Sequence, residues 1–212
     1  APFIGWLCTL VWGSVETDTA SLYFVLSLSS LWFGCINSCR EIVKDRAIFE
    51  RERLLGVSTP AFIASRFIVL SRLAIVQVLL LQMAVEWSIG LRGPFLLQSL
   101  ALWLCSLCGI GLGLLVSALS QAQERAVGAV PLLILPQILF SDFAVPEEHF
   151  TSVVTTIEKC MPVHWSYEIF VQLAGMETDW FLVCLCCMVL AIMTCALGAL
   201  TYVALVPRRE VI

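Results

Sequence analysis

The side chains of this 212-residue chain that could carry covalent or redox chemistry are chiefly ten cysteines and two histidines. Cys105 and Cys108 have the Cys-x-x-Cys spacing of a metal or redox pair, but no histidine or second cysteine pair lies near them in the sequence. All the cysteines except Cys160 lie in or at the ends of apolar runs, where a thiol packs as a small hydrophobic group. We therefore expect packing roles for the cysteines and no metal site.

The two histidines, His149 and His164, both lie in one polar segment of the C-terminal third. His164 precedes Trp165, a pair that favours packing at a membrane interface over catalysis. The sequence contains no Gly-x-Ser-x-Gly, no His-Glu-x-x-His and no facing pair of carboxylates within an apolar run. An intramembrane enzyme is thus an alternative without an evident catalytic site. Few charges lie within the apolar runs, which disfavours an ion channel, and a non-transporting scaffold is the third alternative.

Charge is concentrated in one stretch between two long apolar runs, from Arg40 to Arg53. The whole chain has 12 basic and 16 acidic residues, and this stretch holds five and four of them. The basic ones are Arg40, Lys44, Arg46, Arg51 and Arg53, and the acidic ones are Glu41, Asp45, Glu50 and Glu52. A mixed-charge segment of this kind is expected at the membrane surface, where it can contact a soluble partner.

A helix built from this stretch would have apolar and charged sides. Its apolar side chains are Val43, Ala47 and Leu54 on one side, with Ile42 and Phe49 next to them. Such a pattern predicts an amphipathic helix lying on the membrane, ended by Gly56 and Pro60. The alternative is a solvated loop held by weak surface ion pairs.

Composition predicts that the rest of the chain lies in a membrane. The sequence is 60% hydrophobic and 13% charged, with a mean hydropathy of +0.95, whereas soluble domains average about 25% charged residues. We expect one all-α membrane domain over residues 1–212 with six spans, because only helices and closed barrels cross a bilayer. The predicted spans are residues 1–13, 20–39, 61–85, 94–118, 126–140 and 181–206, the first of them truncated.

Several residues within the spans predict how these helices pack. Gly109 and Gly113 have the small-xxx-small spacing of close helix contact in lipid. Pro131 and Pro136 are expected to break the fifth run. Arg72 either snorkels to the nearer interface or faces the protein interior and pairs there with a polar group.

The basic residues of the polar segments predict on which side of the membrane each segment lies. The charged stretch, the link Ser120–Arg125 and the C-terminus hold eight of the 12 basic residues, so the positive-inside rule places them in the cytoplasm. The long segment Ser141–Trp180 then lies outside. Its apolar patches Val153–Ile157 and Tyr167–Leu173 are too short to span and are expected to form short interfacial or re-entrant helices.

Two motifs resemble the membrane domain of ABC exporters of the G-subfamily type, the ABC-2-type permeases. The first runs from Glu41 through Ile48-Phe49-Glu50-Arg51-Glu52-Arg53 to Gly56-Val57-Ser58 and Ala61-Phe62-Ile63, and is similar to the family's Glu-x-x-x-Phe-x-x-Glu-x-x-x-Gly-x-Tyr. The second is Phe140-Ser141-Asp142-Phe143, Pro146 and Met161-Pro162 with Tyr167-Glu168, similar to the family's Phe-x-Gly-Phe, Pro and Ser-Pro-x-x-Tyr.

The chain departs from these family patterns at two positions and in its cysteines. Ser58 stands where the family usually has Tyr, and Asp142 stands where it has Gly. Only Cys160 lies in an outer loop, so the intraloop disulfide of some animal members cannot form. We therefore expect a bacterial-type member in the bacterial inner membrane, with a cytoplasmic C-terminus.

The resemblance implies an ATP-driven exporter that works by alternating access on a lipid, a hydrophobic drug or a lipid-linked glycan. It implies an ATPase domain upstream in the same chain, which would bind ATP and Mg, because no Gly-x-x-x-x-Gly-Lys-Ser/Thr occurs here. It also implies a second permease copy, as a homodimer or with a close homologue, enclosing a central apolar cavity in the bilayer. No nucleic acid is expected as a partner.

Four groups of candidate site residues follow from this interpretation. The coupling helix comprises Arg40, Glu41, Arg46, Phe49, Glu50, Arg51, Glu52, Arg53 and Gly56. The second cytoplasmic link comprises Gln123, Glu124 and Arg125. The candidate cavity residues are Phe33, Asn37, Pro136 and Phe140, and the outer lid residues are Asp142, Pro162, His164 and Tyr167.

Overall fold

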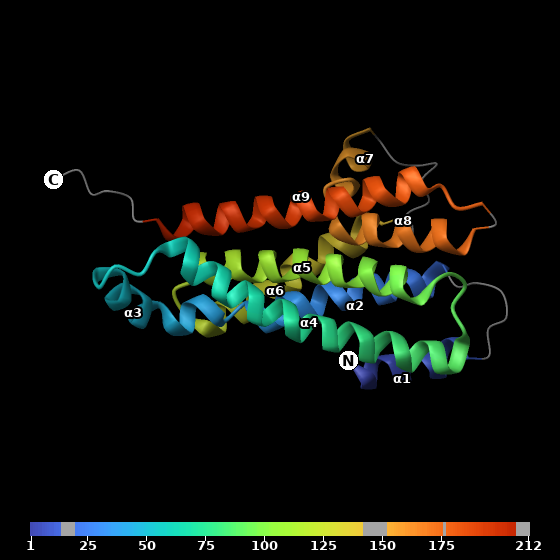
Figure 1. The fold of residues 1–212 in the computed structure, drawn as a ribbon, viewed down its shortest axis with the longest axis horizontal. Helices are drawn as coiled ribbons and strands as arrows, with labels where there is room; N and C mark the ends of the chain where they lie inside the picture. Colours follow the sequence, from blue (N-terminus) through green and yellow to red (C-terminus); the bar gives the residue numbers. More distant parts are fainter. Residues whose placement is uncertain (14–19, 142–151, 176, 207–212) are drawn as a thin grey trace.

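The computed structural model describes residues 1–13, 20–141, 152–175 and 177–206, and all the regular elements in these ranges are α-helices (Figure 1). They are α1 (Pro2–Trp12), α2 (Ala20–Ser38), α3 (Glu41–Leu54), α4 (Thr59–Ile89), α5 (Phe95–Leu119), α6 (Gln123–Leu139), α7 (Ser152–Glu158), α8 (Pro162–Ala174) and α9 (Trp180–Leu205). The prediction of an all-α membrane protein is confirmed.

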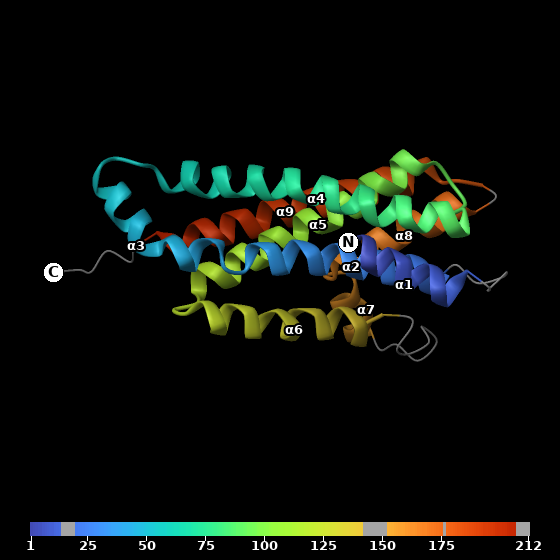
Figure 2. The same ribbon diagram turned by 90° about the horizontal axis from the view of Figure 1, so that it is seen from below.

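The longer helices run roughly along one common axis as a bundle (Figures 1 and 2). Among the described residues, four stretches are long and apolar enough to cross a bilayer: Ala20–Leu54, which contains α2 and α3, and the helices α4, α5 and α9. The other two predicted spans correspond to shorter helices, α1 with 11 residues and α6 with 17. α1 packs against the half of α4 that lies away from α3 (Figures 1 and 2).

The centre of the bundle is the contact between α2 and α5, which run in the same direction. Glycines bring their backbones together, as the small-xxx-small spacing predicts. A methyl group added to Gly109 would collide with the carbonyl oxygen of Leu31, and one added to Gly113 would lie 2.6 Å from the carbonyl oxygen of Cys35. Gly34 of α2 meets α5 in the same way. The two helices therefore form a closely packed pair, around which α4, α8 and α9 are arranged.

α6 corrects one prediction. Pro131 and Pro136 lie inside a single helix from Gln123 to Leu139, so the expectation that they break this run is wrong. A proline removes one backbone donor, yet membrane helices tolerate it because neighbouring groups satisfy the freed carbonyls.

The long segment after α6 contains two short helices, as predicted. α8 is packed into the bundle: its Ser166 hydroxyl lies 3.0 Å from the Ser27 hydroxyl of α2, and its Phe170 ring stacks on Tyr23 at 5.1 Å between ring centroids. Both Phe170 and Ser166 are fully buried. α8 thus closes the end of the bundle that is distant from α3 (Figure 1).

The polar segments gather at opposite ends of the bundle. α3, the loop between α3 and α4, the link between α5 and α6, and the end of α9 lie at one end, on the left of Figure 1. The α4–α5 turn and the start of α9 lie at the other end. The charged stretch and the second polar link therefore share one end of the molecule.

We predict that Gly109→Ala lowers the stability of the full-length protein by about 1–3 kcal/mol, the usual cost of overpacking a well-packed core. The added methyl group would have to push the α2 backbone away at Leu31. Thermal unfolding in detergent measures the effect. Gly198→Ala is the matched control, because no atom lies within 4 Å of its added methyl group, and the loss of a helical glycine should raise stability by about 0.5–1 kcal/mol. Equal behaviour of the two variants would contradict the close contact.

Candidate functional site

The charged stretch forms α3, which follows α2 after a turn at Cys39 and Arg40. The buried side of α3 is narrow: Ile42 and Phe49, seven residues apart on one face, are 0% and 2% exposed. They join a core cluster with apolar residues of α4 and α5. On the predicted apolar side of α3, Ala47 and Leu54 are exposed. α3 buries only the side chains that meet α4 and α5.

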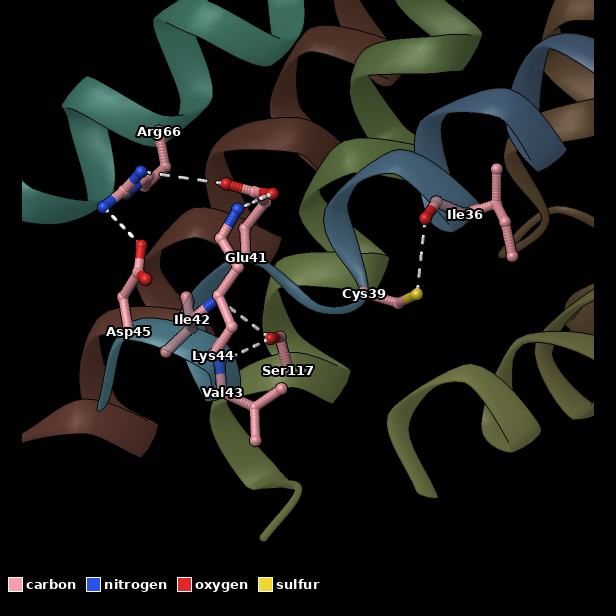
Figure 3. Close-up of polar contacts among 9 residues, drawn as sticks. All are labelled: Ile36, Cys39, Glu41, Ile42, Val43, Lys44, Asp45, Arg66 and Ser117. Carbon is pink, nitrogen blue, oxygen red and sulfur yellow. Dashed lines mark hydrogen bonds and ion pairs between the residues drawn. The ribbon is translucent and has the colours of Figure 1, made fainter. Parts of the chain in front are cut away.

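The start of α3 is capped by a side chain from another helix. The backbone N–H groups of Ile42 and Val43 both donate to the hydroxyl oxygen of Ser117, at 3.0 Å each (Figure 3). These are the second and third residues of α3, whose N–H groups have no partner inside the helix. A local capping residue usually supplies this bond, but the residue in that position, Arg40, makes no such bond. Ser117, in the last turn of α5, takes its place and is fully buried.

Arg46 makes the reciprocal contact with the end of α5. Its guanidinium donates to the carbonyl oxygen of Ser120, at 3.2 Å, and to that of Ala118. The last carbonyls of a helix lack partners in the helix and carry its negative dipole end, so a cation is favourable there. Together, Arg46 and Ser117 fasten the start of α3 to the end of α5.

Arg66 fastens α3 to α4. Its Nη2 lies 2.6 Å from the Asp45 carboxylate and its Nη1 lies 3.8 Å from the Glu41 carboxylate (Figure 3). The Arg66 guanidinium also lies 5.3 Å from the centre of the Phe62 ring, which stacks on Phe49 at 4.2 Å. The Arg66 side chain is 33% exposed, so water screens part of the ionic attraction. The buried Phe49–Phe62 stack adds a contact that salt does not weaken.

The contacts of α3 with its two neighbours are made by different groups. The contacts to α5 use the backbone N–H groups of Ile42 and Val43 and the Arg46 guanidinium. The ionic contacts to α4 use the Glu41 and Asp45 carboxylates, so α3 is attached to both helices independently.

The opposite side of α3 is open. Glu50, Arg51 and Glu52 are exposed, and Arg53 is partly exposed. Apolar side chains are exposed beside them at the end of α3 and in the loop: Ile48, Leu54, Leu55 and Val57. Gly56 has φ +99°, which other residues rarely adopt, and its position in the turn directs the chain into α4. This exposed side combines charge with apolar area.

The second predicted cytoplasmic link lies beside the charged stretch. Gln123, Glu124 and Arg125 form the first turn of α6. Gln123 and Glu124, with Arg40, line a cavity of about 440 Å³ that extends to Val127 and Gly128. The structure thus brings two predicted cytoplasmic segments together.

The candidate cavity residues occupy different surroundings. Phe33 is buried in the core of this chain. The amide of Asn37 donates to the Gln77 side chain of α4, at 2.7 Å. Pro136 lies inside α6 and is half-buried. Phe140, just after α6, is half-buried next to the lid residues.

The predicted lid residues within the described part gather at the other end of the bundle. His164 and Tyr167 line a small cavity with Phe140, and His164 Nδ1 lies 3.2 Å from the buried Glu158 carboxylate. Pro162 begins α8 and is buried. Asp142 lies outside the described residues.

Sequence reasoning missed the two anchors of α3. Arg66 and Ser117 are the partners that hold the helix, yet Arg66 was noticeable only as a basic residue near the start of a predicted span. Ser117 gave no signal beyond its position at the end of the fourth span. Arg72 is exposed on α4 and makes no ion pair within the described ranges, so the interior pairing considered for it is not observed there.

Comparison with known proteins gives two matches. Residues 3–174 match the family described as ABC-2 type transporter. Over 142 residues the chain is 23% identical to an ABC transporter ATP-binding/permease protein of Mycobacterium tuberculosis. That match covers 63% of this chain and 16% of the length of the relative.

We predict that Ser117→Ala loosens the start of α3 by about 1 kcal/mol, the usual cost of losing a helix-capping side chain. The N–H groups of Ile42 and Val43 would then have no acceptor. Hydrogen–deuterium exchange of the peptide around these residues should become faster in the full-length protein. Ser65→Ala is the control, because the Ser65 hydroxyl bonds only within α4, to the Phe62 carbonyl. Unchanged exchange in the Ser117 variant would show that the cap does not hold α3.

Proposed function

The chain belongs to the ABC-2 type transporter family as the multi-pass membrane domain of an ABC transporter permease, and we propose that it serves an ATP-driven exporter. The proposed substrate is hydrophobic or amphipathic: a lipid, a drug or a lipid-linked glycan. The proposed mechanism is alternating access across the bacterial inner membrane. The observation that carries this proposal is the double attachment of α3 to α4 and α5, with its other side exposed.

The exposed side of α3 is the proposed contact for an ATPase domain. Interfaces that must engage and release combine apolar area with a polar rim, and exposed Leu54 and Leu55 lie beside Glu50, Arg51 and Glu52. ATP and Mg would be held by the ATPase domain, because this chain has no phosphate-binding glycine loop. The name of the mycobacterial relative, which joins ATP-binding and permease functions, supports this arrangement.

Movement of α3 would be transmitted to the substrate path through the residues that attach α3 to α4 and α5. Ser117 and Arg46 connect α3 to α5, and the glycine contacts connect α5 to α2. Arg66 connects α3 to α4. α2, α4 and α5 would therefore move as one body when the ATPase pushes on α3, and the second link at Gln123 and Glu124 would follow. ATP binding can shift the inward–outward equilibrium only if the ATPase favours one of the two positions of α3.

A second permease copy would complete the path. In this proposal Asn37, Pro136 and Phe140 face the path between the two copies, and Phe33 supports it from the core. The lid would consist of Asp142 with Pro162, His164 and Tyr167, and the last three lie at the end opposite α3. Leu132 and Leu135 of α6, which are 68% and 51% exposed, offer apolar area for the contact between copies or for lipid.

The proposed orientation places α3 and the C-terminus in the cytoplasm. The basic residues of the charged stretch and of the second link lie at one end of the bundle, and basic residues favour the cytoplasmic side.

We predict that Arg66→Gln uncouples transport from ATP hydrolysis. Transport should fall by about tenfold, a size typical of coupling free energies between sites, because α4 would lose its ionic contact with Asp45 and Glu41. Basal ATPase activity should persist, since nucleotide binds elsewhere. The measurement is ATP-dependent movement of a fluorescent lipid in vesicles that contain the full-length protein with its ATPase.

Arg72→Gln is the matched control for this experiment, because it removes the same charge from an exposed position of the same helix. The exchanged pair Asp45→Arg with Arg66→Asp should recover part of the transport. Equal transport by Arg66→Gln and the natural protein would contradict the coupling role. Turnover of a substrate without any nucleotide would favour the intramembrane enzyme, and absence of both activities would favour a scaffold.

A further inference from the structure

An apolar groove lies between α4 and α9 near the α3 end of the bundle. Its volume is about 450 Å³, within the range of about 300–1,000 Å³ typical of ligand sites. It is lined by Ile63, Phe67 and Ile68 of α4 and by Cys195, Gly198 and Tyr202 of α9, among others. Almost all of this lining is apolar. In a membrane protein, a groove of this kind accommodates a hydrocarbon chain.

A second cavity lies just beyond the groove, between α3 and the last turn of α9. Its volume is about 600 Å³, and its charged lining consists of Arg46, Arg53 and Glu50. Within the described ranges, no carboxylate lies at ion-pair distance from either arginine. Carbonyl groups accept hydrogen bonds from Arg46 but do not neutralise its charge. The cavity therefore has a net positive lining.

The two sites are neighbours along α9. Tyr202 lines the groove, and Ala204, Leu205 and Val206 line the cavity. Leu205 follows Tyr202 by three residues, so the two lie on the same face of α9, about 4.5 Å apart along the helix axis. The structure thus places an apolar groove directly next to a cavity with a basic lining.

We propose that these two sites together bind one anionic phospholipid of the leaflet on the α3 side. An acyl chain occupies the groove between α4 and α9, and the phosphate lies against Arg53 and Arg46. Charge complementarity selects this occupant: a phosphodiester supplies one negative charge to a cavity with two arginines and one glutamate. Arginine suits phosphate because its planar fork donates two parallel hydrogen bonds.

Such a lipid would contact two elements that the proposed function sets in motion, α3 and α4, and would also contact α9. The groove belongs to α4 and α9, and Arg46 belongs to α3. The bound lipid would favour the arrangement in which these helices form the groove. This placement in the cytoplasmic leaflet rests on the proposed orientation, whereas the binding itself does not.

The test measures lipids retained by the purified full-length protein in mild detergent, by native mass spectrometry, without nucleotide. Phosphatidylglycerol and phosphatidylcholine with the same acyl chains are titrated in turn. The natural protein should retain one phosphatidylglycerol more tightly than phosphatidylcholine. Glycerol phosphate, which carries a phosphate without acyl chains, should not bind.

Two variants separate the headgroup from the acyl chain. Arg53→Gln should weaken phosphatidylglycerol binding by about fivefold, the effect of one arginine near an anionic headgroup, and leave phosphatidylcholine unchanged. Gly198→Leu should weaken the retention of both lipids, because its side chain enters the groove, where no atom lies within 4 Å of the added Cβ. Gly198→Ala is a milder second variant if the leucine variant is unstable.

Arg51→Gln is the matched control, since Arg51 is exposed on the same helix and does not line the cavity. Equal retention of the two lipids by the natural protein would overturn the proposal. So would tight binding of glycerol phosphate, or no effect of Gly198→Leu and Gly198→Ala. Failure of ATP-driven transport with the predicted lipid binding intact would count against the proposed function alone, and the reverse result would count against this inference alone.

Discussion

The end of α5 and the start of α3 satisfy each other's backbone polar groups. A helix end leaves N–H or C=O groups without partners, and such groups are costly near a membrane because few water molecules are available to bond them. Ser117 accepts from the first amides of α3, and Arg46 donates to the last carbonyls of α5. Neither helix end can leave this position without exposing unpaired polar groups. The orientation of the whole charged stretch depends on this exchange.

The contact with α4 supplements that exchange by a different physical means. Arg66 lies between two carboxylates of α3, and its guanidinium also covers the Phe62 ring next to Phe49. The ionic part is partly solvated and weakens in salt, whereas the aromatic part is buried. α3 is therefore held on one side by backbone groups and on the other by side chains, and its remaining surface is open to a partner.

Much of this arrangement could be predicted from the sequence, because long apolar runs admit only helices in a bilayer. The spacing of Gly109 and Gly113 likewise predicted a close helix contact, and the structure shows that the partner is α2. Sequence rules failed where a residue far away in the sequence determines the local structure. Pro131 and Pro136 were expected to break the fifth run, but α6 continues through both. Helical periodicity placed Leu54 on the apolar side of α3, but α4 and α5 cover Ile42 and Phe49 instead. Ser117 could not be recognised as a cap, since it lies far from α3 in the chain.

The glycine contact between α2 and α5 has a consequence for how this protein can change over evolutionary time. Where two backbones touch, there is no side chain to exchange, so substitutions there alter the helix separation and not the chemistry of a surface. New substrate preferences would then have to arise on helices that are packed through side chains, such as α6, whose exposed leucines can be replaced one at a time. The sequence at the α2–α5 contact would then stay nearly constant, while the sequences of the outer helices change.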